Sequence, residues 1–243
     1  MATLSNQGKI DISCWDGTIS QHEFHTAASA FAERWNKFNA ALPQCSWVAR
    51  PISPYLSSTS KDEGYLSVEN VIMFPTPAAE SCYGGDDKEG EEELSCSRSQ
   101  EDDFIDGATM LQNHDDASHH YDFHVVYNAS YRVPVLYFRA YCSDGRTLVL
   151  DDVEKSIPAI SAKLLMLSKW TFITQEDHPY LNCPWYTLHP CGTSEWMKML
   201  FSHEPAVDDG GVAVAKYLVS WFSVAGQVFG LKIPFEMLSS IGN

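Results

Sequence analysis

The stretch YDFHVVYNASYRVPVLYFRAY, residues 121–141, decides the fold. Its two runs, 121–127 and 131–141, are rich in Val, Tyr and Phe, residue types that favour β-strands. Pro134 lies inside the second run and has no amide to donate, so it predicts a sheet edge or a bulge there. The stretch therefore predicts two neighbouring strands of an antiparallel meander.

The residues that follow this stretch extend the meander. SDGR, at 143–146, has the composition of a hairpin turn and predicts a further strand over 147–150. Asp151 or Asp152 is then expected to cap a helix that runs to about Leu165, with Pro158 as a break within it. Residues 170–193 show no clear period and are expected to be irregular, with helices starting at Ser194 and covering 212–225.

The N-terminal part predicts a helix followed by two strands. Ser20 and Glu23 match a capping box, S-x-x-E. Apolar residues recur behind it at three- and four-residue steps, which predicts an amphipathic helix over 20–38. Strands are expected at 47–50 and 65–74, each ending at a proline. Helix, meander and helices together predict an α+β fold.

Charge separates one segment from the rest of the 243 residues, which we expect to form a single domain. The chain has a net charge of -16, and residues 80–118 hold 13 carboxylates against two basic residues. This segment cannot bury enough apolar surface to offset its ordering entropy, so it predicts a disordered acidic insertion. Such an insertion is either a solvated spacer or a regulatory or docking segment. The acidity argues against a nucleic-acid binder and against charge-driven membrane docking.

We expect no segment that directs the chain to a membrane or to secretion. The longest apolar stretch, 219–231, is short and interrupted by Ser, Gly and Gln, and the N-terminus has no signal-peptide core. We therefore expect a cytoplasmic protein without stable membrane insertion. Its seven cysteines are odd in number and are expected to be reduced.

Cys191 is the cysteine with a suggestive setting. It lies three residues before the expected helix start, where amides and the helix dipole stabilise a thiolate. His189 is two residues away, and Pro190 stiffens the approach. A reactive thiol and a buried structural cysteine both remain open, because free cysteines are often buried.

Zinc binding is a further alternative. His178, Cys183, His189 and Cys191 could supply four ligands, but their spacing does not match the paired pattern of structural zinc sites. We assign no metal and no cofactor. The chain also has no phosphate-binding loop, dinucleotide fingerprint or protease signature.

Four motifs in order carry a resemblance to a known family: YRVPVLYFRA at 131–140, TQEDHP at 174–179, HPC at 189–191 and SWFSVAGQVFGL at 220–231. They resemble the autophagy-related protein ten family of E2-like conjugating enzymes, over residues 120–235. The resemblance implies a ubiquitin-conjugating-enzyme-like fold, an antiparallel sheet flanked by helices.

The resemblance also implies the reaction. Cys191 would accept the ubiquitin-like autophagy-related protein twelve as a thioester from the activating enzyme, protein seven. It would pass this donor to a lysine of autophagy-related protein five, a transferase step of autophagosome assembly. The alternatives are the related E2-like enzyme that lipidates the eighth autophagy protein, which also uses His-Pro-Cys, and a catalytically silent scaffold.

The chain departs from ordinary ubiquitin-conjugating enzymes at the residue after His-Pro. Those enzymes carry an oxyanion-stabilising Asn there and a cysteine further along, whereas this chain has Cys191 there and Met199 downstream. The oxyanion donor must therefore differ. His189 is one candidate, and Tyr131 and Asn128 are two others.

Overall fold

A six-stranded antiparallel sheet forms the centre of the computed structural model, which describes residues 9–11, 15–50, 62–74, 118–158, 173–202 and 211–239. In spatial order the strands are β2 (Ser46–Ala49), β3 (Gly64–Met73), β4 (His119–Asn128), β5 (Val133–Cys142), β7 (Pro184–Leu188) and β6 (Ile173–Asp177). Two short strands, β1 (Lys9–Asp11) and β8 (Gly211–Ala213), pair separately.

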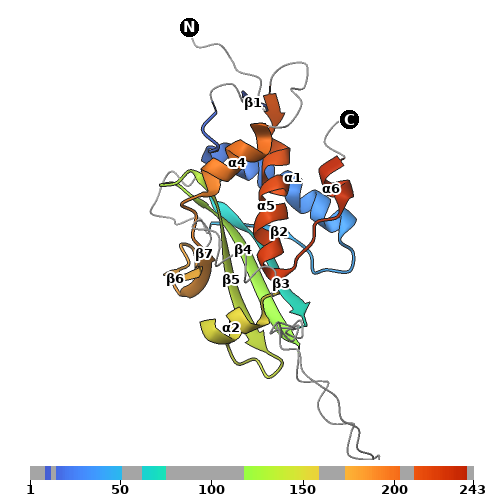
Figure 1. The fold of residues 1–243 in the computed structure, drawn as a ribbon, viewed down its shortest axis with the longest axis vertical. Helices are drawn as coiled ribbons and strands as arrows, with labels where there is room; N and C mark the ends of the chain where they lie inside the picture. Colours follow the sequence, from blue (N-terminus) through green and yellow to red (C-terminus); the bar gives the residue numbers. More distant parts are fainter. Residues whose placement is uncertain are drawn as a thin grey trace, which may run out of the picture.

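Helices complete the α+β architecture that the sequence predicts. They are α1 (Gln21–Phe38), α2 (Leu150–Ser156), α4 (Thr193–Ser202), α5 (Val214–Ala225), the 3-10 turn η1 (Gly226–Phe229) and α6 (Phe235–Ser239). Figure 1 shows α5 crossing one face of the sheet with α1 next to it, and β6 and β7 at one side. No helix in the described ranges is long and apolar enough to cross a membrane.

The two faces of the sheet carry different side chains. On β4, Tyr121, Phe123 and Val125 belong to the main core that α1 and α5 cover. The alternate residues His124 and Val126 are buried on the opposite face, which we call the outer face. The alternation of side chains along a strand therefore gives the sheet two separate buried layers.

Helix α1 confirms the predicted amphipathic helix, including its start. The Ser20 hydroxyl accepts from the Glu23 amide, and the Glu23 carboxylate accepts from the Ser20 amide at 2.7 Å. Its apolar stripe is buried against α5, where the Phe31 and Phe222 rings lie 5.2 Å apart.

Strand β5 corrects the expectation at Pro134. The strand is internal to the sheet, and its register with β4 runs unbroken through the Tyr127–Pro134 pair. However, β7 meets β5 at only two residues, Tyr137 and Phe138. Pro134 lies beyond this overlap, so its missing amide interrupts no pairing with β7.

The residues after β5 differ from the prediction. The turn forms, with Gly145 at φ +83°, but the strand expected at 147–150 reduces to a single bridge between Tyr141 and Thr147. Helix α2 already begins at Leu150, because the return strand is replaced by a helical turn packed through buried Val153.

The expected aspartate cap of this helix is wrong. Val149 occupies the cap position and offers no side-chain bond, while Asp151 and Asp152 lie within the first turn, where their charge suits the helix dipole. The predicted extension to Leu165 and the acidic insertion, apart from Ser118, lie outside the described residues.

The segment expected to be irregular is instead a β-hairpin. Strands β6 and β7 pair from Ile173–Leu188 to Asp177–Pro184. Asn182, at φ +51°, turns the chain between them, and the His178 amide donates to the Cys183 carbonyl at 2.9 Å. The helix expected at 212–225 begins two residues later, because Val212 and Ala213 belong to β8.

Candidate functional site

The HPC loop, residues 189–192, joins the end of β7 to the start of α4. Pro190 is buried, whereas His189 and Cys191 on either side of it are partly exposed. The Pro190 carbonyl accepts from the Thr193 amide at 3.0 Å, and the Gly192 carbonyl accepts from the Trp196 amide at 3.2 Å. The loop is therefore anchored through its proline and the first turn of α4, which begins one residue earlier than predicted.

His189 and Cys191 are joined through the backbone. The Cys191 amide donates to Nδ1 of His189 at 3.2 Å. In the neutral ring, this acceptor role leaves the proton on Nε2. The ring thus carries a hydrogen-bond donor two residues from the thiol.

The Cys191 thiol is distinguished from other described cysteines by its surroundings. It is free and partly exposed beside the N-terminus of α4. Cys45 is also free but buried, and desolvation raises its pKa to about 12. Cys191 is not buried, so the alternative of a buried structural cysteine does not apply to it.

Tyr131 lies next to the HPC loop. Its ring meets the His189 ring edge-on with centroids 5.8 Å apart, and 43% of the residue is exposed. The Asn128 side-chain oxygen accepts from the amides of Ser130 and Tyr131, each at 3.0 Å. The structure thus brings Tyr131 to His189 and places Asn128 under the turn that presents Tyr131.

Residues 15–19, which the sequence analysis does not single out, contact both the Tyr131 turn and α4. The Ile19 amide donates to the Arg132 carbonyl at 2.9 Å, which ties residues 15–19 to the Tyr131 turn. Gly17, at φ +85°, packs so closely on α4 that an added Cβ would lie 1.8 Å from the Ser194 carbonyl oxygen. The Asp16-Gly17 pair was the available signal, because such dipeptides mark turns.

The four residues considered for zinc do not form one site. Cys183 precedes β7 and His189 follows it, and five extended residues span roughly 17 Å. His178 lies at the Cys183 end, bonded to that residue's carbonyl. Within the described residues, no group of three or more potential ligands could hold a metal ion.

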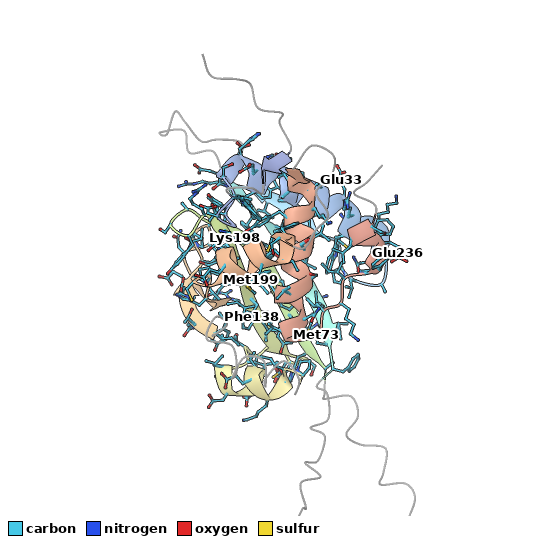
Figure 2. All side chains as sticks on the ribbon, turned by 45° about the horizontal axis from the view of Figure 1, so that its top comes forward. Glu33, Met73, Phe138, Lys198, Met199 and Glu236 are labelled. Atoms are coloured by element: carbon cyan, nitrogen blue, oxygen red, sulfur yellow. The ribbon has the colours of Figure 1, made fainter. Side chains whose placement is uncertain are left out.

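Met199 is the residue downstream of the HPC loop that the sequence analysis compares with the cysteine of ordinary conjugating enzymes. It lies on α4 and is 65% exposed (Figure 2). A thioether cannot form a thioester, so Met199 cannot be the nucleophile. The available thiol is that of Cys191, which lies in the HPC loop 8 positions before Met199.

Comparisons with known proteins agree with these features. The family model described as "Autophagocytosis associated protein, active-site domain" matches residues 23–236. The ubiquitin-like-conjugating enzyme ATG10 of Arabidopsis thaliana is 45% identical over 92% of this chain and 96% of its own length. ATG10 of Homo sapiens is 40% identical over 48% of this chain and 51% of its own.

A solved structure was also found. The crystal structure of the autophagic E2 Atg10 covers 91% of this chain and 98% of its own, at 16% identity and a TM-score of 0.44. The family model spans most of the chain, and the Arabidopsis relative matches it nearly end to end. The chain therefore belongs to the autophagocytosis-associated, active-site-domain family, together with the ATG10 ubiquitin-like-conjugating enzymes, and it is an E2-like transferase of autophagy.

Proposed function

We propose that this enzyme accepts the ubiquitin-like autophagy-related protein twelve as a thioester on Cys191 and transfers it to a lysine of autophagy-related protein five. The observation that carries the proposal is the HPC loop itself. The partly exposed free thiol of Cys191 lies between a buried proline and the N-terminus of α4. The Cys191 amide donates to the His189 ring.

In the first step, the Cys191 thiolate attacks the carbonyl carbon of the thioester that joins the donor's C-terminal glycine to the activating enzyme, protein seven. A new carbon–sulfur bond forms, and the activating enzyme's sulfur leaves as a thiolate. Thiol exchange of this kind depends on the thiolate fraction and on access to the sulfur. Cys191 is free and partly exposed beside the first turn of α4, so its sulfur is accessible to the incoming thioester.

In the second step, a neutral lysine amine attacks the same carbonyl carbon. A tetrahedral oxyanion forms and collapses, the carbon–sulfur bond breaks, the amine loses a proton and Cys191 leaves as a thiolate. The Nε2 proton of neutral His189 is the donor we propose for the oxyanion. The Tyr131 hydroxyl and the Asn128 amide are the second candidates, because both lie on the turn beside His189.

Similarity to proteins named ATG10 supports protein twelve as the donor, rather than the eighth autophagy protein. The Arabidopsis relative matches 92% of this chain and 96% of its own length. The relatives are named conjugating enzymes, which supports a catalytic role over a silent scaffold.

The test is a charging assay with purified protein, activating enzyme, ATP and protein twelve. We expect an adduct that reductant removes, absent in Cys191→Ser or trapped there as a reductant-stable ester. Cys142→Ser is the matched control, since Cys142 is also free and partly exposed. It should charge normally.

A chase then tests the acceptor and donor. Adding protein five to the charged enzyme should convert the adduct into a reductant-resistant conjugate. Charging by the eighth protein in place of protein twelve would contradict the proposed donor. No adduct with either, with the activating enzyme shown to be charged, would contradict the proposed reaction.

A further inference from the structure

Two histidines are buried together on the outer face of the sheet, away from the helices. His124 on β4 is 1% exposed, and His178 in the β6–β7 turn is 0% exposed. Nδ1 of His124 and Nε2 of His178 lie 3.1 Å apart. The charged form of an imidazole is costly to bury, so this contact needs a specific proton arrangement.

The surrounding hydrogen bonds define that arrangement. The Tyr180 amide donates to Nδ1 of His178 at 3.3 Å, which leaves the His178 proton on Nε2. This proton can then be donated to Nδ1 of His124. The remaining His124 proton, on Nε2, faces the Glu69 carboxylate at 3.2 Å. Both rings are neutral in this chain of bonds, and every donor has one acceptor.

One additional proton disrupts this series of hydrogen bonds. A proton on Nδ1 of His124 would face the Nε2 proton of His178. If His178 moved its proton to Nδ1, that proton would face the amide of Tyr180 instead. Either way two donors are left pointing at each other inside a buried layer, which costs the full desolvation of the groups.

Aromatic rings enclose the pair and leave little room for relaxation. His124 stacks on Trp185 at 4.2 Å and lies 4.5 Å from the Tyr65 ring. His178 meets the edge of Tyr137 at 5.1 Å. These rings come from β7, β3 and β5, so the pair lies where the hairpin turn folds over the sheet.

The charged groups around the pair do not supply a compensating anion inside the layer. Glu69 and Asp122 favour the charged form of His124 and Arg139 opposes it, but the Glu69 side chain is 62% exposed, so burial of the ring prevails. Glu176 on β6 contributes to the raised pKa of Tyr137, after burial, and accepts a hydrogen bond from Thr174. Burial accordingly lowers the pKa of His124, and burial with the neighbouring His124 and Arg139 lowers the pKa of His178 to about 4.

The strand pairing that holds the β6–β7 hairpin on the rest of the sheet is short. β7 pairs with β5 at two residues only, whereas β4 pairs with β5 at ten. Beyond these pairs, the Arg139 guanidinium donates to the Pro184 carbonyl at 2.8 Å. In the turn, the Tyr180 hydroxyl accepts from the Gly64 amide at 3.1 Å, and His178 contacts His124. β7 ends at Leu188, three residues before Cys191.

We propose that His124 and His178 are positioning residues whose neutral, hydrogen-bonded pair docks the β6–β7 hairpin on the sheet, so that acidification releases the hairpin and displaces the HPC loop. Docking of the hairpin is inferred from the contacts of His124 and His178 alone. Its consequence for Cys191 rests on the proposed function.

The size of the effect follows from proton linkage. If release lets one histidine take up a proton, the ratio of docked to released hairpin falls up to tenfold per pH unit. The fall starts near pH 6.5, the ordinary value for histidine, and ends near the lowered value of about 4. The contribution of the neutral pair to docking is therefore fully present above pH 6.5 and is lost as the pH falls through this window.

The first experiment uses the unmodified protein. Nitrogen chemical shifts of the imidazoles should report Nε2-protonated neutral rings for His124 and His178 at pH 7. Amide protection across β7, at Tyr186 and Thr187, should fall between pH 6.5 and 4 relative to β4. Rings that titrate near pH 6.5 without loss of protection, or protection that stays constant, would overturn the proposal.

The second experiment removes the titration while filling the space. The double substitution His124→Phe/His178→Phe replaces both partners and should make amide protection of β7 independent of pH. His178→Phe alone leaves His124 without its partner and should weaken this protection at all pH values. His22→Gln is the control, because this histidine is exposed on α1. Equal pH dependence in the double variant and in the unmodified protein would contradict the proposal.

Charging of Cys191 over the same pH range separates the two proposals. We expect charging to fall more steeply with acidification in the unmodified protein and in His22→Gln than in the double variant. Absence of charging at every pH would count against the proposed function alone, since the imidazole shifts and amide protection still decide the docking. Constant protection with normal charging would count against the docking alone.

Discussion

The Nδ1 atom of His189 accepts the backbone amide of Cys191, at 3.2 Å. The ring therefore has two separable uses. Nδ1 holds the backbone of the nucleophile, and Nε2 carries a proton that faces away from that bond. The variants below separate these uses and the roles of the neighbouring turn.

Substitution of His189 distinguishes oxyanion donation from loop holding. Glutamine can place an amide donor near the position of Nε2, whereas asparagine can place its oxygen near the position of Nδ1. We expect His189→Gln to keep most of the transfer to lysine and His189→Asn to lose about 10²- to 10³-fold in the transfer rate. Single-turnover chase of charged enzyme measures this rate. The reverse order of the two variants would show that the bond to the Cys191 amide is the important one.

Tyr131 contacts His189 through its ring. Because the edge-on contact at 5.8 Å needs the ring and not the hydroxyl, Tyr131→Phe should transfer at near the normal rate. Tyr131→Ala should slow transfer about fivefold, since aromatic contacts contribute about 1 kcal/mol. The same chase assay measures both. A phenylalanine variant as slow as the alanine variant would instead identify the hydroxyl as a donor.

Asn128 holds the turn that presents Tyr131. Its side-chain oxygen accepts two amides, so Asn128→Ala should lower the free energy of unfolding by about 1 kcal/mol and slow transfer. Asn128→Asp keeps the acceptor and removes the amide donor. It should restore stability in denaturant titration and restore transfer. Restored stability without restored transfer would assign the amide donor a direct role.

Two glycines with similar backbone angles form a matched pair. Gly17 and Gly145 have φ of +85° and +83°, but an added Cβ meets the Ser194 backbone at Gly17 and nothing within 4 Å at Gly145. Gly145→Ala should cost about 1 kcal/mol through backbone strain. Gly17→Ala should cost about 3 kcal/mol, because strain and overpacking add. Thermal unfolding measures both, and equal costs would contradict the close packing of residues 15–19 on α4.

Local signals explain which elements the sequence predicts well. The start of α1 is encoded by Ser20 and Glu23, which are neighbours on the same turn, so no distant contact is needed to recognise it. The strands around 121–141 are long and rich in β-formers, and their alternation matches the two buried faces. The HPC loop was predicted from a short motif followed by a helix, and the structure has the same arrangement.

The missed elements depend on distant partners. The β6–β7 hairpin has strands of five residues whose turn is held by His178 and Tyr180 against β3 and β4. Nothing local in residues 173–188 shows those contacts. Helix α2 was misjudged for the opposite reason, because two aspartates resemble a cap while buried Val153 sets where the helix packs.

The proximity of Tyr131 and His189 was likewise invisible in the sequence, although both residues were chosen as candidates. They are 58 positions apart, and the contact needs the β4–β5 turn to reach the end of β7. The brace at residues 15–19 was missed because its significance lies in Ser194 and Arg132, far along the chain.

Mapping the covalent adduct by mass spectrometry tests the central claim most directly. The charged enzyme would be digested without reductant, and the peptide joined to the C-terminal glycine of protein twelve would be sequenced. We predict a glycine remnant on Cys191 and on no other cysteine, with a stable remnant at the same position in Cys191→Ser. A remnant on Cys183 or any other cysteine, or a charged enzyme that retains an unmodified Cys191, would contradict the assignment.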